Sequence, residues 1–231
     1  MALQLVIGNK NYSSWSLRPW LLMAELGINF DEIKVRFDFS DGSPFRQTVA
    51  RLSPAGRVPI LVDDGFAVWD TLAIAEYLHE KFPALNVWPK ATQNRARARS
   101  LCAEMHSGFG ALRSHCPMNL EAKLVDVGKG LYKDKPDLRR DLARIEQMWS
   151  ELLRTSGGPM LMGSFGAIDA YFAPVCTRIR TYGLPVSAAV GAYVDRLHAL
   201  PSFQRWHTAA LAEHDFIVED EPYRPLPDKT A

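Results

Sequence analysis

The sequence predicts an α/β domain over residues 1–82, followed by an all-helical domain over residues 91–231. Strand-like and helix-like segments alternate in the first part, whereas every patterned segment in the second part is helical. Residues 83–90 contain two prolines and little periodicity, as expected of a linker. A chain of 231 residues can form one large domain or two ordinary ones, and the change in composition favours two.

The chain opens with a predicted strand, a loop and a helix. Apolar residues alternate over residues 3–7, which predicts a short strand, and a stretch rich in Asn, Ser and Tyr follows. Apolar residues then recur at helical spacing over residues 17–24. A serine suits a helix start and a glycine suits a helix end, so we expect this helix to begin at Ser13 or Ser14 and to stop at Gly27.

A hairpin and a second helix are predicted before the linker. Residues 32–37 indicate a weakly patterned strand, and the polar residues 40–54 indicate irregular chain. Residues 56–69 hold two strand-like runs around an Asp-Asp-Gly turn, which predicts a hairpin. Asp70 then opens a helix that we expect to run as far as Lys81. The predicted order is β-α-β-(irregular)-β-β-α.

The second part reads as a helical bundle. Residues 136–155 form the clearest amphipathic helix, and residues 167–178 are apolar on nearly every side, as expected of a helix at the centre of a bundle. Asp169 follows Gly166 by three residues, so its carboxylate can reach back to the first amides of that helix. We interpret it as structural. The proline-rich residues after Asp220 are predicted to be extended, without core side chains.

Composition excludes several classes of function. The chain has 27 Lys and Arg against 26 Asp and Glu, and this formal net charge of +1 does not favour nucleic-acid binding. No apolar run has the length of a membrane span, and the first residues do not resemble a signal peptide. The three cysteines form no disulfide or zinc pattern, and the six histidines have no metal spacing. We therefore expect a cytoplasmic protein without a metal.

Four segments resemble motifs of the cytosolic glutathione transferase superfamily. They span most of the chain and occur in the family's order. The Ser-Ser-Cys-Ser-x-Arg turn of the zeta class resembles Tyr12-Ser13-Ser14-Trp15-Ser16-Leu17-Arg18, and the Gly-x-Val-Pro before a cis-proline resembles Gly56-Arg57-Val58-Pro59. The family's acidic-Ser/Thr helix start resembles Trp69-Asp70-Thr71-Leu72-Ala73-Ile74-Ala75-Glu76-Tyr77-Leu78. The helix start of the family's second domain resembles Phe165-Gly166-Ala167-Ile168-Asp169-Ala170-Tyr171-Phe172-Ala173-Pro174.

The resemblance implies a thioredoxin-like first domain that binds glutathione and a helical second domain that holds another substrate. It implies a homodimer, and an enzyme that activates the glutathione thiol for attack on a hydrophobic electrophile, as in detoxification. Two departures from the family patterns concern the class. Trp15 stands where zeta proteins have cysteine, and Gly166 stands where the second-domain motif has a capping serine or threonine.

The resemblance makes Ser13 the first candidate for the catalytic residue and Ser14 the second. A free thiol with a pKa near about 8.5 is mostly protonated at neutral pH, so an enzyme must stabilise its anion. A serine at a helix start can donate a hydrogen bond to the sulfur, and the helix dipole adds to it. The alternative is that both serines only cap the helix. Tyr12 is a weaker candidate, because some classes use tyrosine near this point.

Glutathione contacts are also implied by the resemblance. Val58-Pro59 should be a cis bond that turns the Val58 backbone toward the peptide-like middle of the ligand. Asp70 and Thr71 should hold the γ-glutamyl amine and carboxylate. A trans proline at a strand start and a plain helix cap at Asp70 are the alternatives. Arg57 either neutralises a ligand carboxylate or is a solvated surface residue.

A second-substrate pocket is expected where polar and aromatic residues interrupt a helical pattern around residues 104–113. Several side chains there recur at three or four residues and can line one face of a helix. A mixture of core and surface residues is the alternative. With the tryptophan of the serine turn, the candidates are Trp15, Met105, His106, Phe109 and Arg113.

Two other functions remain open. The serine pair also suits a glutathione-dependent isomerase of the maleylacetoacetate type. A non-catalytic regulatory protein could keep the fold and bind glutathione without lowering its thiol pKa. A thiol-disulfide reductase is disfavoured, because a serine cannot form the mixed disulfide that such chemistry needs.

Overall fold

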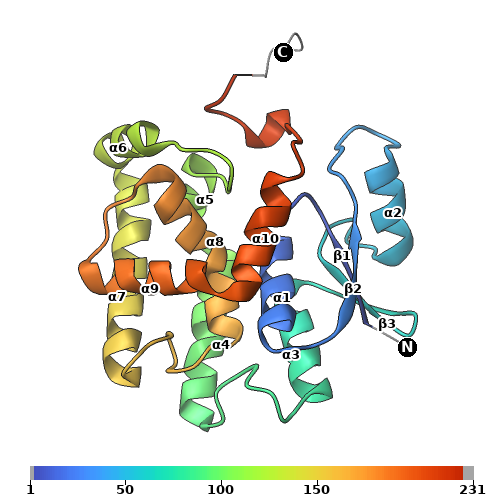
Figure 1. The fold of residues 1–231 in the computed structure, drawn as a ribbon, viewed down its shortest axis with the longest axis horizontal. Coiled ribbons are helices and arrows are strands. Elements are labelled where there is room, and N and C mark those ends of the chain that lie inside the picture. The colour runs from blue at the N-terminus through green and yellow to red at the C-terminus, as the bar shows by residue number, and fades with distance from the viewer. Residues whose placement is uncertain (1–2, 226–231) are drawn as a thin grey trace.

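The computed structural model describes residues 3–225 and has a sheet on one side and a helical bundle on the other (Figure 1). The first side is built from β1 (Leu3–Ile7), α1 (Ser14–Glu25), β2 (Phe30–Lys34), α2 (Pro44–Leu52), β3 (Ile60–Asp63), β4 (Phe66–Trp69) and α3 (Thr71–Lys81). The second is built from α4 (Thr92–Ser107), α5 (Gly110–His115), α6 (Val125–Asp134), α7 (Pro136–Ser156), α8 (Ala167–Tyr182), α9 (Ala188–Ala199), α10 (Pro201–Leu211) and the short helix η1 (Val218–Asp220).

The sheet has four strands in the order β2-β1-β3-β4. β1 pairs in parallel with β2, and β3 pairs antiparallel with both β1 and β4. This is a thioredoxin-like arrangement, and the predicted fold class is confirmed. The second strand lies earlier than the sequence pattern indicated, at Phe30–Lys34 rather than residues 32–37. Its side chains are mostly exposed, and an edge strand that buries so little has only a weak alternating pattern.

The prediction of irregular chain over residues 40–54 is wrong, because α2 lies there. Ser43 caps this helix by accepting a hydrogen bond from Arg46 N at 3.2 Å, and Pro44 occupies its first turn, where a proline is tolerated. Phe45 and Val49, one helical turn apart, are buried beneath it. Polar residues outnumber the few apolar residues of this short helix, so the sequence shows only a weak helical periodicity.

The helical part agrees closely with the predicted pattern. α7 spans the predicted amphipathic helix, and α8 is buried along almost its whole length, with Arg180 the exposed exception. The carboxylate of Asp169 accepts from Gly166 N at 3.1 Å, which confirms the predicted reach back to the helix start. It also accepts from Leu161 N and from the Tyr193 hydroxyl, so it joins the start of α8 to α9.

α1 lies between the two sides of the molecule (Figure 1) and packs against α3, α8 and α10. One large apolar cluster therefore runs from the sheet through α1 into the bundle. Residues 82–91, between α3 and α4, include the buried side chains of Val87 and Trp88, and the Val87 carbonyl accepts from Ala167 N at 2.8 Å. The domain boundaries drawn at residues 82 and 91 stay a prediction. Within residues 3–225, no helix combines the length and the hydropathy needed to cross a bilayer.

The prediction that the chain beyond Asp220 carries no core is wrong for its described part. Glu221 is buried, and Tyr223 packs on the core with its hydroxyl donating to the His115 carbonyl at 2.8 Å. Arg224 forms ion pairs with Glu121 and Glu221. Prolines predict an extended backbone, and they say nothing about where its other side chains pack. Pro227 lies outside the described residues.

Candidate functional site

The serine turn connects β1 to α1. Ser13 is the N-cap of α1, and its Oγ accepts from Ser16 N at 3.3 Å. The Oγ atoms of Ser13 and Ser16 lie 2.7 Å apart in a second hydrogen bond, and Ser16 Oγ also accepts from Gly8 N at 3.2 Å. Ser13 is only 5% exposed. The helix-cap interpretation of Ser13 is therefore correct as far as the fold is concerned, and it leaves open what the same hydroxyl does toward a ligand.

Ser14 is the first residue of α1 and is partly exposed. Within residues 3–225 its hydroxyl makes no hydrogen bond, while its backbone N–H donates to the Tyr12 carbonyl at 2.8 Å. Both serines line a cavity of about 770 Å³, which we call the large cavity. Both therefore have access to a bound molecule, Ser13 from a fixed position and Ser14 from a freer one.

Tyr12 also lines the large cavity, but its hydroxyl is engaged in the protein. It donates to the Glu221 carboxylate at 2.6 Å. Burial, followed by the bond to Glu221, raises the pKa of Tyr12 well above its ordinary value. A tyrosine whose proton is held by a carboxylate is a poor donor to a thiolate, so the geometry favours the serines.

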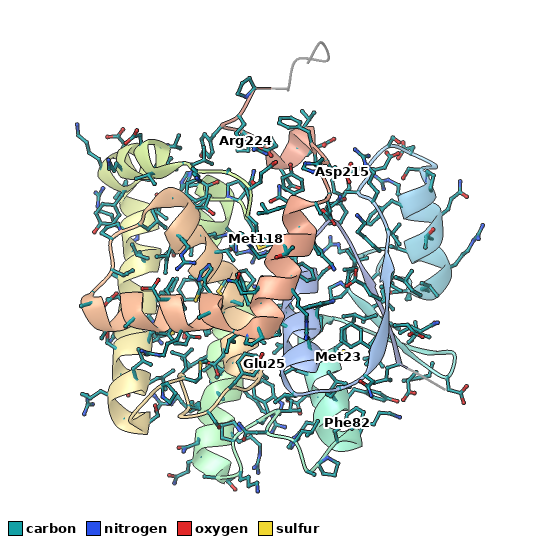
Figure 2. All side chains as sticks on the ribbon, viewed as in Figure 1. Met23, Glu25, Phe82, Met118, Asp215 and Arg224 are labelled. Atoms are coloured by element: carbon teal, nitrogen blue, oxygen red, sulfur yellow. The ribbon has the colours of Figure 1, made fainter. Side chains whose placement is uncertain are left out.

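The C-terminal segment, residues 213–221, holds the loop before the serine turn. Asn9 Nδ2 donates to Asp215 at 2.7 Å, and Lys10 N donates to Glu213 at 2.9 Å. Figure 2 labels Asp215 on this segment at the top of the view, with Arg224 further along the chain. Together with the Tyr12–Glu221 bond, these contacts fix the loop from the side opposite α1.

Val58-Pro59 is a cis peptide bond, as predicted. Val58 precedes β3, whose pairing with β1 starts only at Ile60. Among residues 3–225, no backbone hydrogen bond outside the helices and strands involves Val58. Since buried backbone groups are normally paired, an unpaired N–H and C=O beside a cavity are available to an extended ligand.

Asp70 and Thr71 lie at the start of α3. Asp70 has a positive φ of 73° and caps the helix by accepting from Leu72 N at 2.8 Å. Thr71 is buried, and its Oγ1 lies 2.7 Å from the Tyr171 hydroxyl. The Tyr171 hydroxyl lies in turn 2.8 Å from His106 Nδ1, and His106 Nε2 lies 3.4 Å from the Asp70 carboxylate. These three contacts link the four side chains in a row, which we call the Thr71–Tyr171 network.

A smaller cavity of about 240 Å³ lies beside this network. All five of the predicted glutathione-binding residues and three of the predicted second-substrate residues line it together. They are Arg57, Val58, Pro59, Asp70 and Thr71, with Trp15, His106 and Arg113. The two cavities adjoin, because Trp15, Arg57, Val58 and Arg113 line both. The sequence pattern did not predict that His106 and Arg113 meet the Asp70 motif.

Trp15 is held between two arginines. The Arg18 guanidinium carbon lies 3.9 Å from the centre of the Trp15 ring, and that of Arg113 lies 5.0 Å from it. Arg18 also stacks on Tyr171 and donates to its carbonyl at 3.0 Å. Burial lowers the pKa of Arg18 to about 9, which still leaves it charged at neutral pH. Cation–π contacts of this kind orient the indole at the junction of the cavities.

Two predicted pocket residues are corrected. Met105 is fully buried and Phe109 is almost so, and both belong to the core cluster rather than to the lining of either cavity. α4 ends at Ser107, and Phe109 has a left-handed φ of 55° before α5 begins. This break turns the following helix, so the spacing of three and four residues no longer describes one face. Arg113 reaches the cavities and Phe109 does not.

Several lining residues of the large cavity were not predicted. Arg178 was detectable, since it is an arginine in the otherwise apolar segment of α8. The others had no sequence signal, because they come from separate loops and helices that only the fold brings together. They are Phe37, Phe39, Phe45, Arg46, Gly110, Ser114, Pro117, Met118 and Asp220. Within residues 3–225, no cluster of three or more His, Cys, Asp or Glu side chains has the geometry of a metal site.

Comparison with known proteins places this site in a family. Residues 12–81 match the family described as "Glutathione S-transferase, N-terminal domain". The chain also superposes on a glutathione transferase homolog from a Burkholderia strain, solved with bound glutathione, with a TM-score of 0.67 at 24% identity, over 91% of this chain and 98% of that one. Residues 12–81 therefore belong to the glutathione S-transferase N-terminal domain family, and the chain as a whole has the fold of the cytosolic glutathione transferases.

The proteins to which the chain is similar carry the names of different functions. The chain is 38% identical over 78 residues to a dichloromethane dehalogenase of Methylorubrum extorquens, which is 32% of this chain and only 26% of that protein. It is 31% identical over 102 residues to rat maleylacetoacetate isomerase, covering 44% and 47% of the two chains. A stringent starvation protein A homolog of Haemophilus influenzae matches at 24% over 188 residues, covering 79% and 80%.

Proposed function

We propose that the protein is a glutathione transferase that binds glutathione across the two adjoining cavities and activates its thiol at the serine turn. The observation that carries this proposal is that Ser13, Val58 and Thr71 line one continuous pair of cavities, although they belong to three separate segments. The γ-glutamyl group lies at the start of α3, the cysteinyl backbone pairs with Val58, and the thiol reaches Ser13. Arg57, exposed at the junction, neutralises a ligand carboxylate.

The α3 start offers the right charges for a γ-glutamyl group. A helix N-terminus carries unpaired N–H groups and a partial positive charge, which suit a carboxylate. The Asp70 carboxylate, partly exposed beside the smaller cavity, suits the amine.

Ser13 is the proposed thiolate donor. Lowering a thiol pKa by two units corresponds to about 2.7 kcal/mol, within reach of one charge-assisted hydrogen bond plus the helix dipole. In the structure Ser13 Oγ donates to Ser16 Oγ. Because a hydroxyl proton rotates to suit its partners, this bond can reverse when glutathione binds, so that Ser16 donates to Ser13 while Ser13 donates to the sulfur. Ser16 Oγ still accepts from Gly8 N, so each hydroxyl in the row from Gly8 through Ser16 and Ser13 to the sulfur both accepts and donates a hydrogen bond. Ser14 is the second candidate.

The proposed reaction is attack of the thiolate on an electrophilic carbon in the large cavity. The C–S bond forms, and either a leaving group departs with its electron pair or a double bond takes up the electrons. An isomerase of the maleylacetoacetate type is the alternative enzyme, supported by the serine pair and by the partial similarity to rat maleylacetoacetate isomerase. That enzyme would return product without consuming glutathione, so product analysis with maleylacetoacetate separates the two.

The decisive experiment is a titration of the bound glutathione thiol by its thiolate absorbance. We expect Ser13→Ala to raise the thiol pKa by about two units relative to wild type. Ser187→Ala is the matched control, because Ser187 caps α9 through Val190 N at 3.4 Å and lines neither cavity. If neither Ser13→Ala nor Ser14→Ala raises the pKa, the catalytic assignment is wrong. Glutathione binding with an unshifted thiol pKa would instead identify a non-catalytic binding protein.

The first domain has an exposed apolar face that could form the interface of the expected homodimer. Phe66 and Trp69, at the two ends of β4, are 63% and 41% exposed, and Phe66 lies 6.2 Å from the Tyr77 ring. We propose that this face contacts the helical domain of a second copy, which sedimentation analysis tests by the mass of the particle.

A cytoplasmic location is proposed because the three cysteines are free and buried, as in a reducing compartment.

A further inference from the structure

The lining of the large cavity includes a buried positive charge that forms no ion pair within 4.0 Å, although the charge of Asp220 on the same lining acts on it from further away. Arg178, on α8, is only 4% exposed and lines the cavity. Its Nε donates to the Cys116 carbonyl at 2.7 Å and its Nη1 to the Pro174 carbonyl at 3.0 Å. Within residues 3–225 its Nη2 makes no hydrogen bond, and no carboxylate lies within 4.0 Å of the guanidinium. Carbonyls hold the side chain in place, and its charge stays unpaired.

A second arginine faces the same space. Arg113, on α5, lines both cavities, and like Arg178 it has no ion-pair partner in the described part of the chain. Its Nη1 reaches only the His106 carbonyl, at 3.4 Å. The two arginines repel each other, and this adds to burial in lowering the pKa of Arg178 to about 10. Arg178 therefore remains charged at neutral pH.

The remaining charges of the cavity do not cancel these two. Its lining has four arginines, Arg46, Arg57, Arg113 and Arg178, against one acidic residue, Asp220. Arg46 is exposed and lies 3.9 Å from Asp41, so the excess charge is concentrated at the inner arginines. A buried charge without a partner is costly, and proteins keep one where a ligand completes it. The wall formed by Phe37, Phe39 and Phe45 is apolar.

Resting on the proposed function, we infer that the second substrate is an electrophile that carries a carboxylate, which Arg178 and Arg113 bind while its apolar part packs against Phe37, Phe39 and Phe45. A planar guanidinium suits a carboxylate, which accepts two parallel hydrogen bonds. The two arginines are specificity-determining residues. They select the substrate and orient its reactive carbon toward the sulfur, and they take no part in forming the thiolate.

The test compares 4-(chloromethyl)benzoate with its uncharged methyl ester. In both, the glutathione sulfur forms a bond to the benzylic carbon, chloride leaves with the electron pair, and the thiol proton passes to solvent. We expect kcat/KM for the carboxylate to exceed that for the ester by at least about tenfold in wild type, because a hydrogen bond to a charged group strengthens binding by that order. Arg178→Met and Arg113→Met should each lower kcat/KM for the carboxylate much more than kcat/KM for the ester, so that most of this preference is lost.

Arg180→Met is the matched control, since Arg180 lies on the same helix, is exposed and pairs with Asp195 at 2.8 Å. It should keep the preference. The more exposed Arg113 keeps the test valid if Arg178→Met does not fold. A wild type that treats acid and ester alike, or a preference that survives both substitutions, overturns the proposal.

The failure of the proposed function gives a different result. In that case neither electrophile reacts and the glutathione thiol pKa is unshifted. Calorimetric binding of S-(4-carboxybenzyl)glutathione and of its methyl ester then decides the matter. Tighter binding of the acid, lost in Arg178→Met or Arg113→Met, supports the arginine site without catalysis. Equal binding of the two conjugates, or none, overturns it.

Discussion

The Tyr171 hydroxyl lies 2.7 Å from Oγ1 of Thr71, a residue 100 positions earlier in the chain. Tyr171 is on α8, in the helical part, and Thr71 opens α3, beside the sheet. The same hydroxyl contacts His106 on α4 at 2.8 Å, so three helices meet at one oxygen atom. Burial raises the pKa of Tyr171 to about 12, which keeps this hydroxyl protonated. The bundle thereby fixes the position of the residue proposed to hold the γ-glutamyl carboxylate.

Tyr171→Phe is expected to weaken glutathione binding more than it slows the chemical step. The substitution leaves Thr71 Oγ1 and His106 Nδ1 without their common partner, and a lost hydrogen bond of this kind corresponds to about a tenfold rise in KM. The Ser13 contacts are untouched, so kcat should change little. Steady-state kinetics with varied glutathione measures both values.

The control for this substitution is Tyr132→Phe, since within residues 3–225 the Tyr132 hydroxyl makes no hydrogen bond. It should leave both KM and kcat as in wild type. A fall in kcat at constant KM for Tyr171→Phe would show that the Thr71–Tyr171 network acts on the reaction itself and not on binding.

Tyr12→Phe separates a structural tyrosine from a catalytic one. Removing the hydroxyl leaves the buried Glu221 with one fewer donor, and the free energy of unfolding should fall by about 1–3 kcal/mol. The thiol pKa of bound glutathione should stay at its wild-type value. Thermal unfolding and the thiolate titration measure the two effects. A thiol pKa raised as much as in Ser13→Ala would make Tyr12 the catalytic residue instead.

Stability should depend on pH through His198. Burial lowers the pKa of this histidine to about 4, and its Nδ1 lies 2.8 Å from the Val194 carbonyl. The unfolded chain takes up this proton near pH 6.5 and the folded chain only near pH 4. The stability is therefore complete above pH 6.5 and falls by about 1.4 kcal/mol per pH unit between those values.

The measurement is urea unfolding from pH 7 to pH 4 for wild type and His198→Gln. The difference between the two curves isolates this histidine from Asp169 and Asp220, whose pKa values burial raises to about 6. His214→Gln, at an exposed position, should follow wild type. If His198→Gln loses stability in acid as steeply as wild type, another group is responsible.

Two glycines of α6 should respond differently to alanine. A Cβ on Gly128 would lie 1.8 Å from the Tyr182 carbonyl oxygen, so α6 must move away from α8. Overpacking of this kind costs about 1–3 kcal/mol. Gly130, two residues later, has open space, and Gly130→Ala should be neutral or stabilise by about 0.5–1 kcal/mol. Chemical denaturation of both variants tests the close approach, and equal stabilities would contradict it.

Local chemistry made much of this fold predictable. Ser13 at the start of α1 and Asp70 at the start of α3 are helix caps whose hydrogen bonds reach only two or three residues along the chain. The amphipathic α7 and the buried α8 follow from a repeat within one helix. α2 was missed, because two buried residues in a short polar helix give a weak period.

The site could be predicted only in part, because its parts come from distant segments. Three of the four family motifs indicated Ser13, Val58, Asp70 and Thr71, and these do line the cavities. Met105 and Phe109 were misplaced, since the break between α4 and α5 changes which face looks inward. The charge of Arg178 stood out in an apolar helix, but periodicity does not reveal that its guanidinium faces a cavity shared with the serine turn.

The contacts from Glu213, Asp215 and Glu221 to the loop at residues 9–12 join regions that a ribosome produces far apart in time. The side chains that close the loop follow it by 203 to 209 residues in the chain, so the loop is synthesised well before they are. During translation the first domain therefore carries an unclosed loop. The proposed thiol site is therefore complete only once residue 221 has been synthesised, and a variant truncated before that point is expected to keep most of the sheet and to lose the contacts that hold this loop.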